Sequence, residues 1–185
     1  MLKTTELTHL LIKEHLKLGD TCIDATCGMG NDTLFLRGLV GDQGIVHAYD
    51  IQLDAINETK KLLKDYTNII YHHESHELIN ISNAKVILFN LGYLPNHNKT
   101  IKTNKESTLN AIKNILNIYI NNPDMILFIN CYPGHLEGLE ESNCLIKFSK
   151  NLDSKKYLTT IYQPLNQKNA PFLITIKQKT PLKLL

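Results

Sequence analysis

The chain has 185 residues, of which 43% are hydrophobic and 21% are charged. This length and composition suit a single compact domain over residues 1–185, and they exclude a disordered chain and disfavour two full domains. The formal net charge of +2 allows nucleic-acid binding but does not require it, because a local basic patch matters more than the total.

Nothing in the sequence suggests a membrane or an oxidising compartment. No apolar run is long enough to cross a bilayer, and residues 1–6 lack the layout of a secretion signal. The four cysteines stand apart and include no CxxC pair, which favours free thiols over disulfides. We therefore expect a cytoplasmic protein that does not associate with membranes.

Hydrophobic periodicity predicts helices and strands in alternation along the chain. We expect helices over residues 5–17, 31–38, 53–66, 106–120 and 136–149, the first behind a threonine cap and the second capped by Asn31 and Asp32. We expect strands over residues 21–25, 45–50, 69–72, 85–90, 124–131, 157–163 and 171–179. The buried stripe of the helix at 106–120 should be Leu109, Ile112, Leu116 and Ile120.

The predicted strands are mostly continuous apolar runs, which are typical of a parallel sheet covered by helices on both faces. The last two strands lie too close together for a helical crossover, so they should form an antiparallel hairpin. Seven strands that end in such a hairpin follow the plan of class I methyltransferases. We therefore expect an α/β, Rossmann-like fold with a seven-stranded, mostly parallel sheet.

A glycine-containing turn follows the first predicted strand, where open α/β sheets bind ligands. Residues 24–30, Asp-Ala-Thr-Cys-Gly-Met-Gly, resemble the acidic-x-Gly-x-Gly-x-Gly signature of methyltransferases, with Thr26 in place of the first glycine. Gly28 and Gly30 let the backbone approach a ligand because they carry no Cβ atom. In this turn, which also contains Cys27, Asp24 can attract the α-ammonium group of S-adenosylmethionine.

The polar residues that follow complete a cofactor site in the expected order. Asn31 and Asp32 begin a helix whose N–H groups suit the carboxylate of the cofactor. Asp50 ends the second strand about 20 residues after the glycines, where an acid can accept both ribose hydroxyls. The remaining candidates are Gln52 for the ribose and, after the third strand, Ser75 and His76 for the adenine.

A nicotinamide dinucleotide is the main rival cofactor, because it would use similar geometry. Against it, Thr33 stands where the G-x-G-x-x-G/A pattern ends in a small residue, and the chain is short for a dehydrogenase with a substrate domain. A glycine turn or an acid at the end of a strand can also be purely structural. The three features in this order favour S-adenosylmethionine.

Asn90 ends the fourth predicted strand, and Tyr93 follows it in the sequence Asn-Leu-Gly-Tyr-Leu-Pro. This spacing is similar to the Asn/Asp-Pro-Pro-aromatic motif of amino-methyltransferases. An asparagine carbonyl can accept the hydrogens of a neutral amine and aim its lone pair, and an aromatic ring can stack on a base. We predict that Asn90 and Tyr93 are catalytic. The alternative is structural, with Asn90 as a strand-end cap and Tyr93 as a half-buried core aromatic.

Four segments together resemble a single family. They are residues 24–32 (Asp-Ala-Thr-Cys-Gly-Met-Gly-Asn-Asp), 75–77 (Ser-His-Glu), 90–95 (Asn-Leu-Gly-Tyr-Leu-Pro) and 132–135 (Tyr-Pro-Gly-His). These segments look like the YtqB/MnmM-like class I methyltransferases, once labelled rRNA methylases, and the resemblance covers nearly the whole chain. It departs from the family pattern at 96–98, where Asn-His-Asn replaces Gly-Gly-Asp, and this leaves the contacts of that loop open.

The resemblance implies an S-adenosylmethionine-dependent enzyme that methylates the aminomethyl group of 5-aminomethyl-2-thiouridine at the tRNA wobble position. The partner would be the anticodon region of tRNA, and the sequence is compatible with a homodimer without revealing the oligomeric state. Candidate RNA contacts near the pocket are Leu94, Pro95, Lys99, Lys102, Tyr132 and His135. The lysines could equally be a solvated face, and His135 could equally be held in a turn.

Two other functions stay open, namely methylation of rRNA or another base, and a non-catalytic nucleotide-binding module. The run His-His-Glu-Ser-His at 72–76 lacks the HExxH spacing of zinc enzymes, and no cysteine cluster accompanies it. We therefore predict no metal site.

Overall fold

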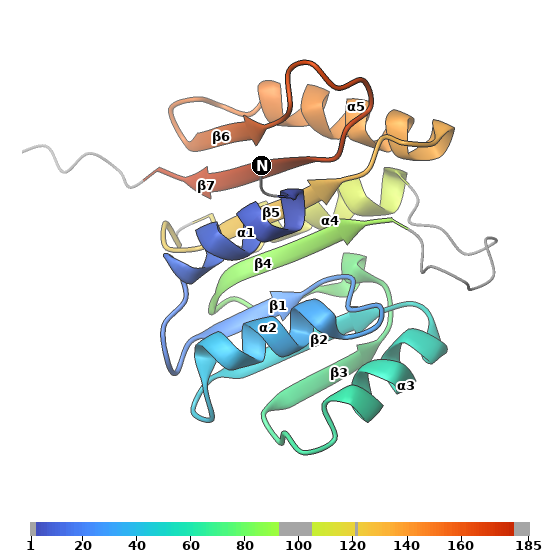
Figure 1. Ribbon diagram of the computed structural model, residues 1–185. Helices are drawn as coiled ribbons and strands as arrows, with labels where there is room; N and C mark the ends of the chain where they lie inside the picture. Colours follow the sequence, from blue (N-terminus) through green and yellow to red (C-terminus); the bar gives the residue numbers. More distant parts are fainter. Residues whose placement is uncertain (1–2, 93–104, 121, 180–185) are drawn as a thin grey trace, which may run out of the picture.

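The computed structural model describes residues 3–92, 105–120 and 122–179 (Figure 1). Its strands are β1 (Thr21–Asp24), β2 (Ile45–Asp50), β3 (Ile69–His73), β4 (Ala84–Leu91), β5 (Ile126–Cys131), β6 (Tyr157–Tyr162) and β7 (Phe172–Gln178). Its helices are α1 (Thr4–Lys13), α2 (Asn31–Val40), α3 (Leu53–Leu62), α4 (Lys105–Ile118) and α5 (Leu136–Lys150), with a short 3₁₀ helix, η1 (His76–Leu78).

The strands form one seven-stranded sheet in the order β3-β2-β1-β4-β5-β7-β6. Strands β1 to β5 pair in parallel with their neighbours, whereas β7 pairs antiparallel with both β5 and β6. Strand β7 therefore runs against the rest of the sheet. This topology confirms the predicted Rossmann-like class, including the reversed strand of the terminal hairpin.

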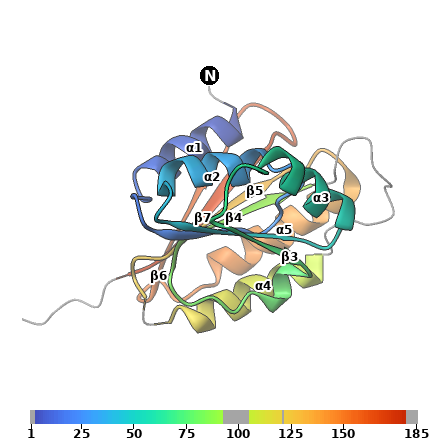
Figure 2. The ribbon, with the colours of Figure 1, turned by 90° about the horizontal axis from the view of Figure 1, so that it is seen from below.

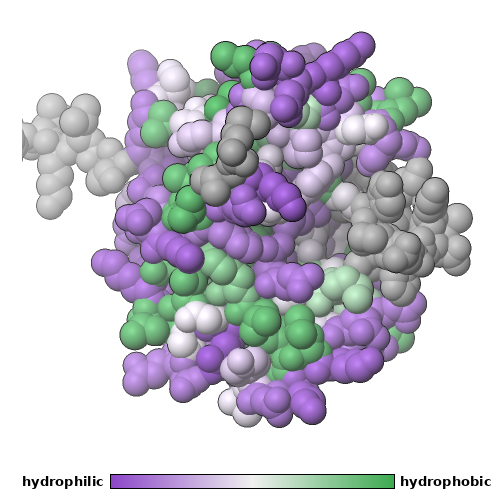
Figure 3. Space-filling model, in the orientation of Figure 1, coloured by the Kyte–Doolittle hydropathy of each residue, from purple (hydrophilic) through white to green (hydrophobic). Residues whose placement is uncertain are grey.

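Helices cover both faces of the sheet, as the apolar strands predicted (Figure 2). Helices α1, α2 and α3 lie on one face, where Ile12, Leu36 and Ile56 belong to one buried cluster. Helices α4 and α5 lie on the other, where Ile112 and Leu145 pack in a second cluster. The outer surface over α1, α2 and α3 is mostly hydrophilic, with smaller hydrophobic areas (Figure 3). The sheet is thus packed between two hydrophobic clusters.

Two helix starts differ from the prediction. Helix α1 has Lys3 rather than a threonine as its N-cap, because the Glu6 carboxylate accepts a hydrogen bond from the Lys3 N–H at 2.8 Å. Helix α2 has Gly30 as its N-cap, so Asn31 and Asp32 lie in its first turn and do not cap it. This shift leaves the Asp32 side chain available for contacts with other elements.

Helix α4 buries most of the predicted stripe, since Ile112 and Leu116 are buried and Leu109 packs against the same cluster. Ala111 and Ile115 on the same helix are fully buried too, whereas the predicted Ile120 lies beyond the end of the helix and is 48% exposed. Tyr119, directly after the helix, is buried instead. The hydroxyl of Tyr119 accepts a hydrogen bond from the Ala84 N–H at 3.0 Å, which turns this residue toward the sheet. No sequence pattern predicts η1, which lies in the connection between β3 and β4.

The parallel strands bring their carboxyl ends to one edge of the sheet. Asp24, Asp50 and Asn90 lie at or next to the ends of β1, β2 and β4, although their predicted roles come from separate parts of the sequence. Within the described part of the chain, no helix is both long enough and apolar enough to cross a membrane.

Candidate active site

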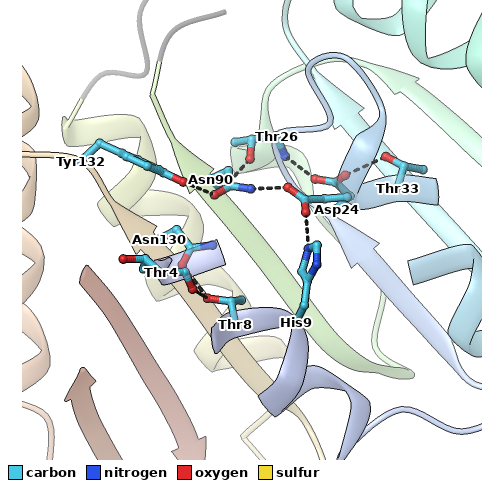
Figure 4. Close-up of polar contacts among 10 residues, drawn as sticks. Thr4, Thr8, His9, Asp24, Thr26, Thr33, Asn90, Asn130 and Tyr132 are labelled. Carbon is cyan, nitrogen blue, oxygen red and sulfur yellow. Dashed lines mark hydrogen bonds and ion pairs between the residues drawn. The ribbon is translucent and has the colours of Figure 1, made fainter. Parts of the chain in front are cut away.

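Asp24 ends β1 and is only 1% exposed. The Thr33 hydroxyl, on α2, donates a hydrogen bond to Asp24 Oδ2 at 2.7 Å, and the Thr26 N–H donates to Oδ1 at 3.3 Å (Figure 4). Burial raises the pKa of Asp24 to about 7, with a further contribution from the nearby Asp32 carboxylate, and the two hydrogen bonds only partly oppose it. A ligand cation placed here would stabilise the ionised form.

Asp50 ends β2 and holds the glycine turn. The Gly28 N–H donates to Asp50 Oδ2 at 3.1 Å, and the Gln52 N–H donates to Oδ1 at 2.9 Å. Burial raises the pKa of Asp50, and these backbone hydrogen bonds oppose the shift. Each carboxylate oxygen has a second lone pair. Asp50 can therefore accept hydrogen bonds from two further hydroxyl groups, as the predicted ribose contact requires.

The turn between β1 and α2 depends on its glycines. Gly28 has a φ of 53° and Gly30 a φ of 82°, in the left-handed region that other residues rarely adopt. A Cβ atom at Gly30 would lie 3.0 Å from Thr59 Cγ2, and the Thr59 hydroxyl donates to the Gly28 carbonyl at 3.0 Å. Cys27 is buried in the same turn, and burial raises the pKa of its thiol, which therefore stays neutral.

The side-chain amide of Asn90 is held from two sides (Figure 4). Its Nδ2 donates to Asp32 Oδ2, and its Oδ1 accepts a hydrogen bond from the Tyr132 hydroxyl at 3.0 Å. A carboxylate only accepts hydrogen bonds, so the amide must turn its nitrogen toward Asp32 and its oxygen toward Tyr132. Burial raises the pKa of Tyr132 to about 12, which keeps its hydroxyl a neutral donor. The amide thus has a defined orientation.

Thr26 has a function that the sequence did not reveal. It occupies the place of the first glycine in the signature, and its hydroxyl oxygen accepts a hydrogen bond from the Asn90 N–H at 2.7 Å. Because its own N–H binds Asp24, Thr26 joins the cofactor turn to the end of β4. The departure from the glycine pattern therefore links the two halves of the site.

Ser75 and His76 follow β3, as predicted, and begin η1. The Ser75 Oγ caps this helix by accepting a hydrogen bond from the Glu77 N–H at 3.2 Å. His76 is 6% exposed, and its ring meets the Phe89 ring edge-on at a centroid distance of 5.5 Å. Burial lowers the pKa of His76, so the ring is neutral at physiological pH. Contact of either residue with adenine stays a prediction.

The two residues predicted after β5 have different surroundings. Tyr132 directs its hydroxyl at Asn90, whereas His135 is the N-cap of α5 and accepts the Gly138 N–H on Nδ1 at 2.9 Å. A Cβ atom at Gly138 would lie 2.3 Å from the Tyr132 carbonyl oxygen, so glycine is required for this close packing. Since Nδ1 already accepts a hydrogen bond, the neutral His135 ring carries its proton on Nε2.

Five predicted site residues lie outside the described part of the chain, namely Tyr93, Leu94, Pro95, Lys99 and Lys102. Their roles stay predictions. Among the residues that the structure describes, no group of three or more histidine, cysteine or acidic side chains is arranged to hold a metal ion.

Sequence reasoning missed His9, which lies in α1 before the first strand. Its Nε2 lies 2.6 Å from Asp32 Oδ1, and its ring stacks on the Phe35 ring with a centroid distance of 3.7 Å. The sequence marks Thr33 only as a mismatch to the dinucleotide pattern, and not as the residue that donates a hydrogen bond to Asp24. Both contacts depend on how α1 and α2 pack against the sheet, and no motif in the sequence marks them.

The parallel sheet, the strand-end acids and the oriented asparagine define the class of the protein: it is a class I methyltransferase. The family model described as "Putative rRNA methylase" matches residues 46–178. The chain belongs to this family. Membership confirms the predicted resemblance and favours S-adenosylmethionine over a nicotinamide dinucleotide.

Three relatives agree with this assignment. The chain is 36% identical over 189 residues to the chloroplastic tRNA (mnm(5)s(2)U34)-methyltransferase of Arabidopsis thaliana, covering 93% of this chain and 68% of the relative. It is 34% identical to an rRNA methylase structure from Clostridium thermocellum, with a TM-score of 0.89, and the match covers 97% of this chain and 99% of that one. It is 32% identical to a methyltransferase from Streptococcus mutans in complex with SAH, with a TM-score of 0.83 and the same coverage. The predicted cytoplasmic location stays a prediction, because the Arabidopsis relative is chloroplastic.

Proposed function

We propose that this protein transfers a methyl group from S-adenosylmethionine to the aminomethyl nitrogen of 5-aminomethyl-2-thiouridine at the tRNA wobble position. The observation that carries the proposal is the oriented amide of Asn90 at the end of β4, between Asp32 and Tyr132. The wobble-uridine activity named for the Arabidopsis relative supports this choice of substrate.

The residues at the ends of β1 and β2 fit the cofactor. Asp24 is buried beside Asp32, so a positive α-ammonium group would relieve the electrostatic cost of ionising it. Asp50 keeps lone pairs for the ribose hydroxyls, and Gly28 and Gly30 let the backbone come close. When bound, S-adenosylmethionine supplies an electrophilic methyl group on a sulfonium.

Asn90 would select and orient the nitrogen that is methylated. An aminomethyl group can act as a nucleophile only in its neutral form, with two N–H donors and one lone pair. The Asn90 Oδ1 accepts from Tyr132 and retains a second lone pair, which can accept one amine hydrogen. This contact fixes the direction of the amine lone pair, and such positioning is a large part of the rate enhancement in two-substrate reactions.

The RNA would reach this edge of the sheet through its anticodon region. Tyr132 lies beside the expected position of the amine, and we propose that His135, at the start of α5, contacts the nucleotide through Nε2. Lys99 and Lys102 are proposed to contact phosphates, and Tyr93, with Leu94 and Pro95, to pack against the base.

The test is a nucleoside profile of tRNA from cells that lack the protein. We expect 5-aminomethyl-2-thiouridine to accumulate and its methylated form to return when the wild-type gene is restored. The Asn90→Ala variant should bind S-adenosylmethionine normally and fail to restore the methylated form. Full restoration by Asn90→Ala would refute the role of Asn90, and a normal tRNA profile in the deletion strain would refute the substrate.

Methylation of rRNA is the second candidate, favoured by the description of the family. The same deletion strain separates the two, because rRNA nucleosides can be profiled from the same cells. An rRNA defect with normal tRNA would support this candidate.

A further inference from the structure

His9 and Asp32 form a contact beside the proposed amine site that the proposed function leaves unexplained. The Nε2 of His9 lies 2.6 Å from Asp32 Oδ1, while Asp32 Oδ2 accepts the hydrogen bond from the Asn90 amide. The side chains of His9 and Asp32 are 31% and 21% exposed. The Asp32 carboxylate therefore bridges two side chains, one from α1 and one from β4.

Packing fixes the position of the His9 ring. The ring lies nearly parallel to that of Phe35, with an interplanar angle of 9°, and Phe35 is one helical turn after Asp32 on α2. The neighbouring residue Thr8 is fully buried, and its hydroxyl lies 2.7 Å from Asn130 Oδ1 on β5. Helix α1 is thus anchored to the sheet beside His9, and the imidazole has little freedom to leave Asp32.

Electrostatics explains why Asp32 needs a donor on its other oxygen. The carboxylates of Asp24 and Asp32 are close enough for Asp32 to raise the pKa of Asp24, so the two acids repel each other. Tyr132, which also faces Asp32, is a neutral hydroxyl that donates to Asn90 instead. Without His9, this repulsion would favour rotation of Asp32 away from Asp24 and out of its contact with Asn90.

We propose that His9 is a positioning residue for methyl transfer, which holds Asp32 so that Asp32 turns the Asn90 carbonyl oxygen toward the substrate amine. The proposal rests on the proposed function of Asn90. If Asp32 moved away, the Asn90 amide could rotate by half a turn and present its N–H₂ group to the amine. Two donors would then face each other, and the amine lone pair would lose its alignment.

Kinetics of three variants test the proposal. His9→Ala should lower kcat by about 10-fold or more, as expected for a misaligned nucleophile, with little change in KM for tRNA or in the Kd for S-adenosylmethionine. His9→Gln should retain most of the activity, because its amide N–H can still donate to Asp32. Lys13→Ala, an exposed change on the same helix, is the matched control and should behave as wild type.

A double variant shows whether His9 acts through Asn90. If it does, His9→Ala combined with Asn90→Ala should be no slower than Asn90→Ala alone. Full additivity of the two losses would overturn the proposal, as would a His9→Gln variant as slow as His9→Ala, which would point to proton transfer by the imidazole. Unchanged kcat in His9→Ala would overturn it as well.

The side-chain amide signals of Asn90 provide a readout that does not depend on turnover. In ¹H–¹⁵N spectra of the protein, His9→Ala should shift these signals, and His9→Gln should return them toward the wild-type positions. Unshifted signals in His9→Ala would contradict the proposal. If Asn90→Ala retained full turnover, the proposed role of Asn90 would be wrong and the inference about His9 would fail with it. If Asn90→Ala lost turnover and His9→Ala retained it, only the inference about His9 would fail.

Discussion

Replacing Asp24 with asparagine should make the free protein more stable and weaken its binding of S-adenosylmethionine. The side chain is 1% exposed, and its pKa is raised from 3.8 to about 7, mainly by burial. At 1.36 kcal/mol per pKa unit, keeping Asp24 ionised costs roughly 4 kcal/mol above pH 7. Asparagine removes the charge. Its Oδ1 can still accept the Thr26 N–H, and its Nδ2 can donate to the Thr33 hydroxyl oxygen, so we expect a gain of ~1–3 kcal/mol in the free energy of unfolding.

The pH dependence follows from the direction of the shift. Between about pH 4 and pH 7 the folded wild-type protein binds more protons at Asp24 than the unfolded chain does, so this group lowers stability as the pH rises through that window. The Asp24→Asn variant lacks this term, and its advantage over wild type should be largest above pH 7. Urea unfolding at pH 5 and pH 8 measures both differences.

Binding should change in the opposite direction. Loss of a charged hydrogen-bond partner for the α-ammonium group should raise the Kd for S-adenosylmethionine by about 10-fold or more at pH 7, as measured by calorimetry. Wild-type affinity should fall by about fivefold from pH 7 to pH 6 as Asp24 becomes protonated, a trend that Asp24→Asn should lack. A variant that is less stable at pH 8, or that binds the cofactor as tightly as wild type, would refute this assignment of Asp24.

Two further predictions concern contacts of the site, and a third concerns a contact between α4 and α5. Thr26→Gly, which restores the signature glycine, should lower the free energy of unfolding in urea by ~1–2 kcal/mol, because the Asn90 N–H loses its acceptor. Thr26→Ser should keep the wild-type stability, and a glycine variant as stable as wild type would count against this contact. Asp50→Asn should raise the Kd for S-adenosylmethionine about 10-fold in calorimetry by weakening the ribose contact, and an unchanged Kd would show that Asp50 only holds the turn. Thr108→Val should lower the free energy of unfolding in urea by ~1–3 kcal/mol, because Glu141, which is 6% exposed, loses the hydroxyl that donates to it at 2.7 Å. Thr108→Ser is the control, and an unchanged free energy of unfolding for Thr108→Val at pH 8 would contradict this reasoning.

The fold could be predicted from the sequence because the apolar strands and the terminal hairpin depend on local patterns. Continuous apolar runs mark β4 and β5 as central strands, and the short link between β6 and β7 excludes a helical crossover. Helix ends were less predictable. Helix α1 stops at Lys13, four residues before the predicted end, since helix ends depend on capping contacts as well as on periodicity.

The positions of the acids and glycines could be predicted because each lies at the end of a strand or in the turn that follows it, in a known order. Their contacts with the cofactor stay a prediction. The contacts that orient Asn90 could not be predicted. His9 is 23 residues from Asp32, and Thr26 is 64 residues from Asn90, so both contacts exist only after the helices and strands have packed. A motif-based comparison also treats Thr26 as a mismatch, although its hydroxyl makes a contact that glycine cannot make.

The most direct measurement is methyl transfer by the purified protein to tRNA that carries 5-aminomethyl-2-thiouridine. With S-adenosylmethionine present, mass spectrometry of the digested tRNA should show the wobble nucleoside gaining one methyl group on its side-chain nitrogen, and Asn90→Ala should slow this gain strongly. An unmodified wobble nucleoside, or a methyl group found on another base, would contradict the assignment of this site to the aminomethyl nitrogen.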